Sequence, residues 1–223
     1  MIVVHHLENS RSQRVLWLLE ELDLRYEIVR YARDPRTMLA PPELRAVHPL
    51  GKSPVLVEEG LVVAESGAIL EYLVERHDLA QRFAPLPQSA DYLRYRYWMH
   101  YAEGSLMPPL LMSLVFSRIR QAPMPFFAKP VAKGIVAAAK KSFVGPQLKL
   151  HLDYLEAELA QRAWFAGEAF SAADIQMSFP LEAAAARVGF ADRPHLQGFL
   201  DRIHARPAYQ RALEQGGPFD LLR

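Results

Sequence analysis

Polar side chains gather near the N-terminus, where an apolar run gives way to a helical pattern. Residues 8–12 read Glu-Asn-Ser-Arg-Ser, between the run Ile2–Leu7 and the helical pattern Arg14–Leu22. The first N–H groups and the positive end of a helix stabilise a nearby anion, and a Ser hydroxyl or Asn amide donates one more hydrogen bond. Helix capping by itself explains Asn9 and Ser10, and such caps occur in most proteins. The stretch indicates an anion site without establishing one.

A second stretch of this kind is His-Pro-Leu-Gly-Lys-Ser-Pro-Val-Leu over residues 48–56. Pro54 opens an apolar strand, where its missing N–H is tolerated, and an X-Pro bond at such a turn is a candidate cis peptide. A turn of this shape leaves the backbone N–H and C=O of Ser53 free to pair with an extended peptide. This signal is weak when taken alone.

The third stretch, Glu65-Ser66, lies where a helical pattern begins. The Ser66 hydroxyl and the first helical N–H groups suit a carboxylate, and Glu65 suits an ammonium group. Together they fit the α-amino acid end of a ligand, although a helix cap beside a surface acid has comparable weight.

A fourth stretch, 170–175, is interpreted as structural. Ser171 and Asp174 have the spacing of a capping box, and Phe170 and Ile175 supply the matching hydrophobic staple. We therefore do not count these residues as a functional site.

The elements that position these stretches differ between the two halves of the chain. The order in the first 80 residues is β-α-β-α-β-β-α, with strands at Ile2–Leu7 and Tyr26–Val29 and a hairpin over 54–64. Residues 81–88 hold two prolines without periodicity and are predicted to be a linker. Helical patterns follow at 90–120, 126–141, 147–162, 172–188 and 194–206. The prediction is an α/β domain (1–80), a linker (81–88) and an all-α domain (89–223).

The amino-acid composition excludes several kinds of chemistry. The chain has 223 residues, 26 Lys and Arg against 25 Asp and Glu, a formal net charge of +1, and no cysteine. Disulfides, thiolate metal ligands and a cysteine nucleophile are excluded, and the balanced charge argues against nucleic-acid binding. No apolar run is long enough for a signal peptide core or a membrane span. We expect a cytoplasmic protein that does not bind membranes.

The charge is unevenly distributed. Seven basic residues and no acidic residue lie between Gly104 and Leu152. A solvated helix face explains this pattern, and so does the mouth of a site for anionic ligands.

In this order, the four stretches resemble the cytosolic glutathione S-transferases, over nearly the whole chain. The pieces that carry the resemblance best are Ser53-Pro54, Glu65-Ser66 and the run 170–174. The start, residues 5–22, looks most like the bacterial and fungal group related to the yeast GTT-type enzymes. The resemblance implies a thioredoxin-like N-terminal domain with a mixed four-stranded sheet, a helical-bundle C-terminal domain, and a homodimer.

The resemblance also implies roles for individual residues. Backbone groups of Ser53, before a cis Pro54, are expected to pair with the cysteinyl part of glutathione, and Glu65 and Ser66 to hold its γ-glutamyl end. Lys52 is the candidate for the glycine carboxylate, with His48 a weaker one. Ser10 is our first choice for the group that contacts the thiol, and Asn9 is the alternative. The expected hydrophobic pocket for the second substrate is lined by Tyr101, Met107 and Leu111.

The implied chemistry uses glutathione as co-substrate and no metal. A thiol titrates near pH 8.5 and reacts as the thiolate, so a site that stabilises the thiolate activates it. The thiolate then attacks a hydrophobic electrophile, in a detoxification role, or reduces a peroxide. A glutathione-dependent isomerase or dehalogenase, and a non-catalytic ligand-binding protein, remain as alternatives on the same fold.

Overall fold

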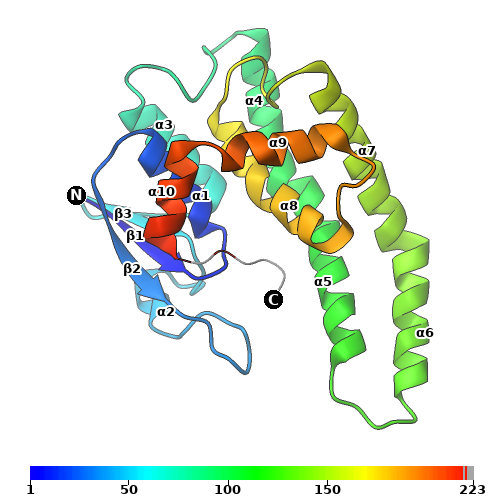
Figure 1. The fold of residues 1–223 in the computed structure, drawn as a ribbon. Coiled ribbons are helices and arrows are strands. Elements are labelled where there is room, and N and C mark those ends of the chain that lie inside the picture. The colour runs from blue at the N-terminus through cyan, green and yellow to red at the C-terminus, as the bar shows by residue number, and fades with distance from the viewer. Residues whose placement is uncertain (218, 220–223) are drawn as a thin grey trace.

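The N-terminal half of the computed structural model is built on a mixed four-stranded sheet, which lies beside the helical half (Figure 1). The structure describes residues 1–217 and 219. The strands β1 (Ile2–Leu7), β2 (Tyr26–Tyr31), β3 (Val55–Glu58) and β4 (Leu61–Ala64) are arranged in the order β2-β1-β3-β4. β1 is parallel to β2 and antiparallel to β3, with Val4 opposite Leu56. Helices α1 (Ser12–Glu21), α2 (Leu44–Val47) and α3 (Ser66–His77) complete the thioredoxin-like domain that the resemblance implies.

The C-terminal half is helical, as predicted. Its elements are α4 (Ala90–Tyr101), the π-helical turn η1 (Ala102–Leu106), α5 (Met107–Gln121), α6 (Lys129–Ala139), the π-helical turn η2 (Lys140–Val144), α7 (Gly145–Gln161), α8 (Ala172–Val188), α9 (Pro194–His204) and α10 (Pro207–Gly216). Among the described residues, no strand follows Ala64. No helix in that part of the chain is long and apolar enough to cross a membrane.

Two features of the helical half differ from the predicted pattern. We expected a break between residues 141 and 147, but the helix continues through η2, and a Cβ on Gly145 would lie 2.8 Å from the carbonyl oxygen of Lys140. A π-helical turn tolerates the missing N–H of Pro146 because its hydrogen-bonding register is already shifted. Helix α10 was not predicted: the last predicted helical pattern ended at residue 206, and Pro207 is the first residue of a further helix.

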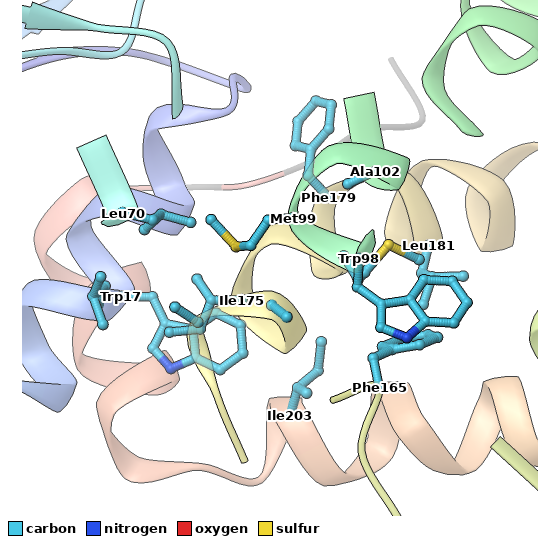
Figure 2. Packing of buried hydrophobic residues seen from close by; sticks show 14 of the residues in the cluster. Trp17, Leu70, Trp98, Met99, Ala102, Phe165, Ile175, Phe179, Leu181 and Ile203 are labelled. Carbon is cyan, nitrogen blue, oxygen red and sulfur yellow. The ribbon is translucent and has the colours of Figure 1, made fainter. Parts of the chain in front are cut away.

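One apolar core joins the two halves. Trp17 of α1 and Leu70 of α3 belong to the same buried cluster as Met99 of α4 and Ile175 of α8 (Figure 2). Helix α10 packs against α1, where Tyr209 meets Trp17 edge to face at 5.1 Å between ring centroids.

Polar contacts also connect the halves. The segment 81–88 has no helix or strand, yet Phe83 is buried and its carbonyl accepts a hydrogen bond from Ala172 N–H at 2.8 Å. At the start of α8, the predicted capping box is confirmed: the Asp174 carboxylate accepts from Ser171 N–H at 2.8 Å and from Ser171 Oγ at 3.0 Å.

Candidate functional site

The β1–α1 junction presents two different polar side chains. Asn9 has φ +49°, a left-handed conformation that Asn tolerates better than most residues, and it lines a cleft between the two halves. Ser10 is 6% exposed, and its Oγ lies 2.8 Å from Ser12 Oγ, which in turn lies 2.8 Å from His6 Nδ1. Burial lowers the pKa of His6, so this imidazole is neutral at pH 7. The hydroxyl of Ser10 therefore belongs to an internal hydrogen-bond chain.

The Ser53–Pro54 peptide bond is cis. Ser53 Oγ donates to the carbonyl of His5 at 2.8 Å and accepts from Leu7 N–H at 3.1 Å, so the side chain continues the contact between β3 and β1. The structure gives neither the amide nor the carbonyl of Ser53 a hydrogen bond to another described residue. These backbone groups remain available at the end of β1 that leads into the α1 junction.

The start of α3 is held by a buried arginine. Arg14 is 2% exposed, and its Nη2 donates to Ser66 Oγ at 2.8 Å and to Glu103 Oε1 at 2.6 Å, while Nη1 donates to the carbonyl of Gln176 at 2.6 Å. Glu65 precedes the helix with φ +70° and an exposed side chain. Non-glycine residues in this conformation cluster at ligand sites.

Lys52 and His48 flank the turn before Pro54. Lys52 is exposed, and no carboxylate among the described residues lies within ion-pair distance of it. His48 is half-buried at the end of α2, and its Nδ1 accepts a long hydrogen bond of 3.4 Å from Leu50 N–H. Both residues belong to the loop between α2 and β3 that also contains Ser53.

The cleft beside Asn9 has a volume of about 260 Å³. Its lining combines apolar and basic side chains: Asn9, Arg11, Arg33, Met38, Met107, Leu110, Leu111, Leu114, Arg118, Phe179, Ala183 and Arg187. Met107 and Leu111 thus lie where the second substrate was expected. Tyr101 does not line this cleft: it is buried against Trp98, with its hydroxyl hydrogen-bonded to His151 Nδ1.

Glu103 neutralises positive charge next to the cleft, because it contacts the lining residue Arg11. Both of its carboxylate oxygens accept from Arg11 Nε at 2.9 Å, and Oε1 also accepts from Arg14. Burial by itself raises the pKa of Glu103, but the neighbouring Arg14 and Arg11 outweigh it and hold that pKa below its ordinary value. The carboxylate is therefore ionised and neutralises much of the local positive charge.

Sequence reasoning missed Arg14 and Arg33. Arg14 directly precedes the apolar helical face that begins at Val15, and a charge beside such a face is a signal for a buried, paired group. Arg33 lies in the irregular segment after β2, which has no periodicity to place it. Among the described residues, no cluster of three His, Asp or Glu side chains is arranged to hold a metal ion.

The fold and site together define a class: a thioredoxin-like domain with a cis-proline turn, joined to a helical domain that closes a basic and apolar cleft. A family model described as "Glutathione S-transferase, N-terminal domain" matches residues 1–75, and one described as "Glutathione S-transferase, C-terminal domain" matches residues 124–207.

Individual relatives agree with these models. "Glutathione S-transferase 3" of Schizosaccharomyces pombe is 40% identical over 219 residues, covering 96% of this chain and 88% of that protein. "Glutathione S-transferase 1" of Saccharomyces cerevisiae is 35% identical over 225 residues, covering 96% of this chain and 95% of that protein. A crystal structure of a glutathione S-transferase from Actinobacillus pleuropneumoniae superposes with a TM-score of 0.84 at 36% identity, covering 100% of this chain and 96% of that one. The chain belongs to the glutathione S-transferase family.

Proposed function

We propose that this protein is a glutathione transferase that activates the thiol of glutathione for attack on hydrophobic electrophiles. The observation that carries the proposal is the pair of unengaged backbone groups on Ser53, next to the junction from which Asn9 reaches the cleft. An extended tripeptide pairs with such groups in the manner of an added strand. The cysteinyl part of glutathione then lies between Ser53 and the start of α1.

The ends of glutathione have partners on either side. Its γ-glutamyl carboxylate is received by the first N–H groups of α3 and by Ser66, whose hydroxyl Arg14 holds in place. Its ammonium group is received by Glu65, and its glycine carboxylate by Lys52, with His48 as the second candidate. The left-handed conformation of Glu65 supports a ligand role, because strain of this kind is retained where it positions a group for binding.

Asn9 is the group we assign to the thiol. Ser10 was the first choice from sequence, but its hydroxyl is buried beside Ser12, whereas Asn9 lines the cleft. The amide of Asn9 and the positive end of α1 both favour the thiolate over the thiol. With an aryl halide, the carbon–sulfur bond forms, the carbon–halogen bond breaks, and halide leaves with the electron pair while the thiol proton goes to solvent.

The experiment combines binding and turnover. Calorimetry with glutathione is expected to give saturable binding that weakens at least tenfold in Ser66→Ala, since a hydrogen bond to a charged group contributes about 1.5–3 kcal/mol. Conjugation of 1-chloro-2,4-dinitrobenzene is expected to accompany binding. Binding without conjugation, peroxide reduction or isomerisation would leave the ligand-binding alternative, and absence of binding would refute the proposal.

We further propose a cytoplasmic homodimer with a detoxification role. Two apolar patches favour a second subunit: Leu61 and Val62 on the edge strand β4 are 49% and 45% exposed, and Leu93 on α4 is 73% exposed. Light scattering is expected to give about twice the chain mass of 25.3 kDa. A mass of one chain at micromolar concentration would contradict this part of the proposal.

A further inference from the structure

The cleft beside Asn9 has an apolar wall and a cationic wall. Helix α5 contributes Met107, Leu110, Leu111 and Leu114, and α8 contributes Phe179. Four arginines line the same cleft, and none of its lining residues is an Asp or Glu. An aromatic or aliphatic body fits the first wall, whereas a neutral molecule leaves the second without a partner.

The four arginines are not equivalent. Arg11 is paired with both oxygens of Glu103. For Arg33, Arg118 and Arg187, no carboxylate of the described residues lies within 4.0 Å of the guanidinium group. None of these three cations therefore has an ion-pair partner in that part of the chain, although Glu8 acts on Arg33 at longer range.

Two of these three are held in position by carbonyl groups. Arg33 donates to the carbonyl of Met38 at 3.0 Å and to that of Asn9 at 3.1 Å, and Arg187 donates to the carbonyl of Ala183 at 3.0 Å. These contacts orient the guanidinium groups without removing their charge. The two guanidinium groups are therefore pre-organised to bind an anion.

Arg118, on α5, acts electrostatically on both of the others. Burial lowers the pKa of Arg33; the Glu8 carboxylate opposes this shift, and the charges of Arg118 and Arg11 add to it. The pKa of Arg187 is lowered by burial and by Arg118. Mutual repulsion of this kind is relieved when an anion binds between the cations. Arg118 also belongs to the acid-free stretch 104–152, so at least this basic residue of the stretch faces the cleft.

We propose that this enzyme selects electrophiles that carry a carboxylate or another anionic group at the end of the hydrophobic body away from the reacting carbon. Arg118 and Arg187 receive the anion, the α5 and α8 side chains receive the body, and the reacting carbon faces the thiol beside Asn9, where Arg33 is held by the Asn9 carbonyl. This inference rests on the proposed transferase function, and it adds the substrate class.

The test uses a matched pair of electrophiles, 4-chloro-3,5-dinitrobenzoate and 4-chloro-3,5-dinitrobenzamide. In both, the glutathione sulfur bonds to the ring carbon, chloride leaves with the bonding electrons, and the thiol proton goes to solvent. Each kcat/KM is divided by the uncatalysed rate constant with glutathione, which removes the electronic difference between the rings. We expect the normalised value to be about tenfold higher for the acid, because a charge-assisted contact is worth about that factor.

Variants test which arginines cause the preference for the acid over the amide. Arg118→Gln and Arg187→Gln are expected to lower kcat/KM for the acid about tenfold, with little change for the amide and no change in KM for glutathione. Arg118→Lys, which keeps the charge, is expected to retain part of the preference. Arg120→Gln is the matched control: it removes a charge two residues away on the same helix, at an exposed position outside the cleft lining.

Three results would overturn the inference. Equal normalised rates for acid and amide would refute the anionic substrate class while leaving the transferase function intact. A higher KM for glutathione in Arg118→Gln and Arg187→Gln, without a selective loss on the acid, would assign these arginines to a carboxylate of glutathione. Absence of both glutathione binding and turnover would remove the proposed function and this inference together.

Discussion

Arg14 and Glu103 form an ion pair between α1 and the π-helical turn after α4, with 2.6 Å between Nη2 and Oε1. The same guanidinium group holds Ser66 at the start of α3 and the carbonyl of Gln176 in α8. One buried side chain therefore connects the N-terminal half with two elements of the helical half.

Replacing Arg14 by Met is expected to lower the free energy of unfolding by about 3–5 kcal/mol, because removing one partner leaves buried polar groups unsatisfied. Since Ser66 also loses its hydrogen bond, KM for glutathione is expected to rise. Urea unfolding and steady-state kinetics measure the two effects. Arg96→Met, at an exposed position on α4, is the control and should change neither. A folded Arg14→Met variant with wild-type stability would contradict the central role of this contact.

The lowered pKa of Glu103 predicts that the stability of the protein depends on pH. Burial opposes ionisation, but Arg14 and Arg11 hold the pKa of Glu103 below its ordinary value of 4.5 in the folded protein. Because the folded pKa is the lower one, the stabilising contribution is complete above pH 4.5 and is lost as pH falls through the folded pKa. Urea unfolding of wild type and Glu103→Gln from pH 7 to pH 3 should therefore show a stability difference that shrinks at acid pH. A difference that grows on acidification would show that the sign is wrong.

The choice between Asn9 and Ser10 predicts opposite patterns for two alanine variants. Asn9→Ala is expected to raise the pKa of bound glutathione by about 1–2 units and to lower kcat/KM about 10–100-fold, the range for a lost hydrogen bond to a charged group. Ser10→Ala is expected to leave the thiol pKa in place and to lower the free energy of unfolding by about 1 kcal/mol, because Ser12 loses one of its hydrogen-bond partners. Thiolate absorbance against pH measures the first effect. The reverse pattern would restore Ser10 as the thiol contact.

The capping box at α8 predicts a loss of stability without a loss of binding. Ser171→Ala is expected to lower the free energy of unfolding by about 1 kcal/mol. Asp174→Ala is expected to cost more, because that carboxylate also accepts from Phe165 N–H at 2.8 Å. KM for glutathione should not change in Ser171→Ala. A selective rise in that KM would mean that the box serves the site as well as the fold.

Local patterns were enough to predict the strands of the first half, the start of α3 and the capping box, because each depends on neighbouring residues. Helix α10 was harder, since its buried face consists of Ala208, Tyr209 and Ala212 and matches α1 in three dimensions. The helix continues through Gly145 because the hydrogen-bonding register of the backbone shifts there, and no residue type in the sequence indicates that shift.

The features of the site likewise separate into those that local sequence predicts and those that depend on tertiary structure. The cis bond at Ser53–Pro54 and the helix start at Ser66 were predicted because turns and helix starts restrict the residues that occupy them. The position of Arg14 against Ser66, and the gathering of Arg33, Arg118 and Arg187 at one cleft, bring together residues far apart in the chain. Only tertiary structure brings them together.

Because Phe83 is buried and hydrogen-bonded to Ala172, the two halves are expected to remain associated after proteolytic cleavage between them. Proteolytic cutting within residues 81–88 severs the covalent connection, but α10 still covers α1 and Arg206 still pairs with Glu21 at 2.6 Å. The two fragments are therefore expected to behave as a non-covalent heterodimer that elutes as one species and separates only under denaturing conditions.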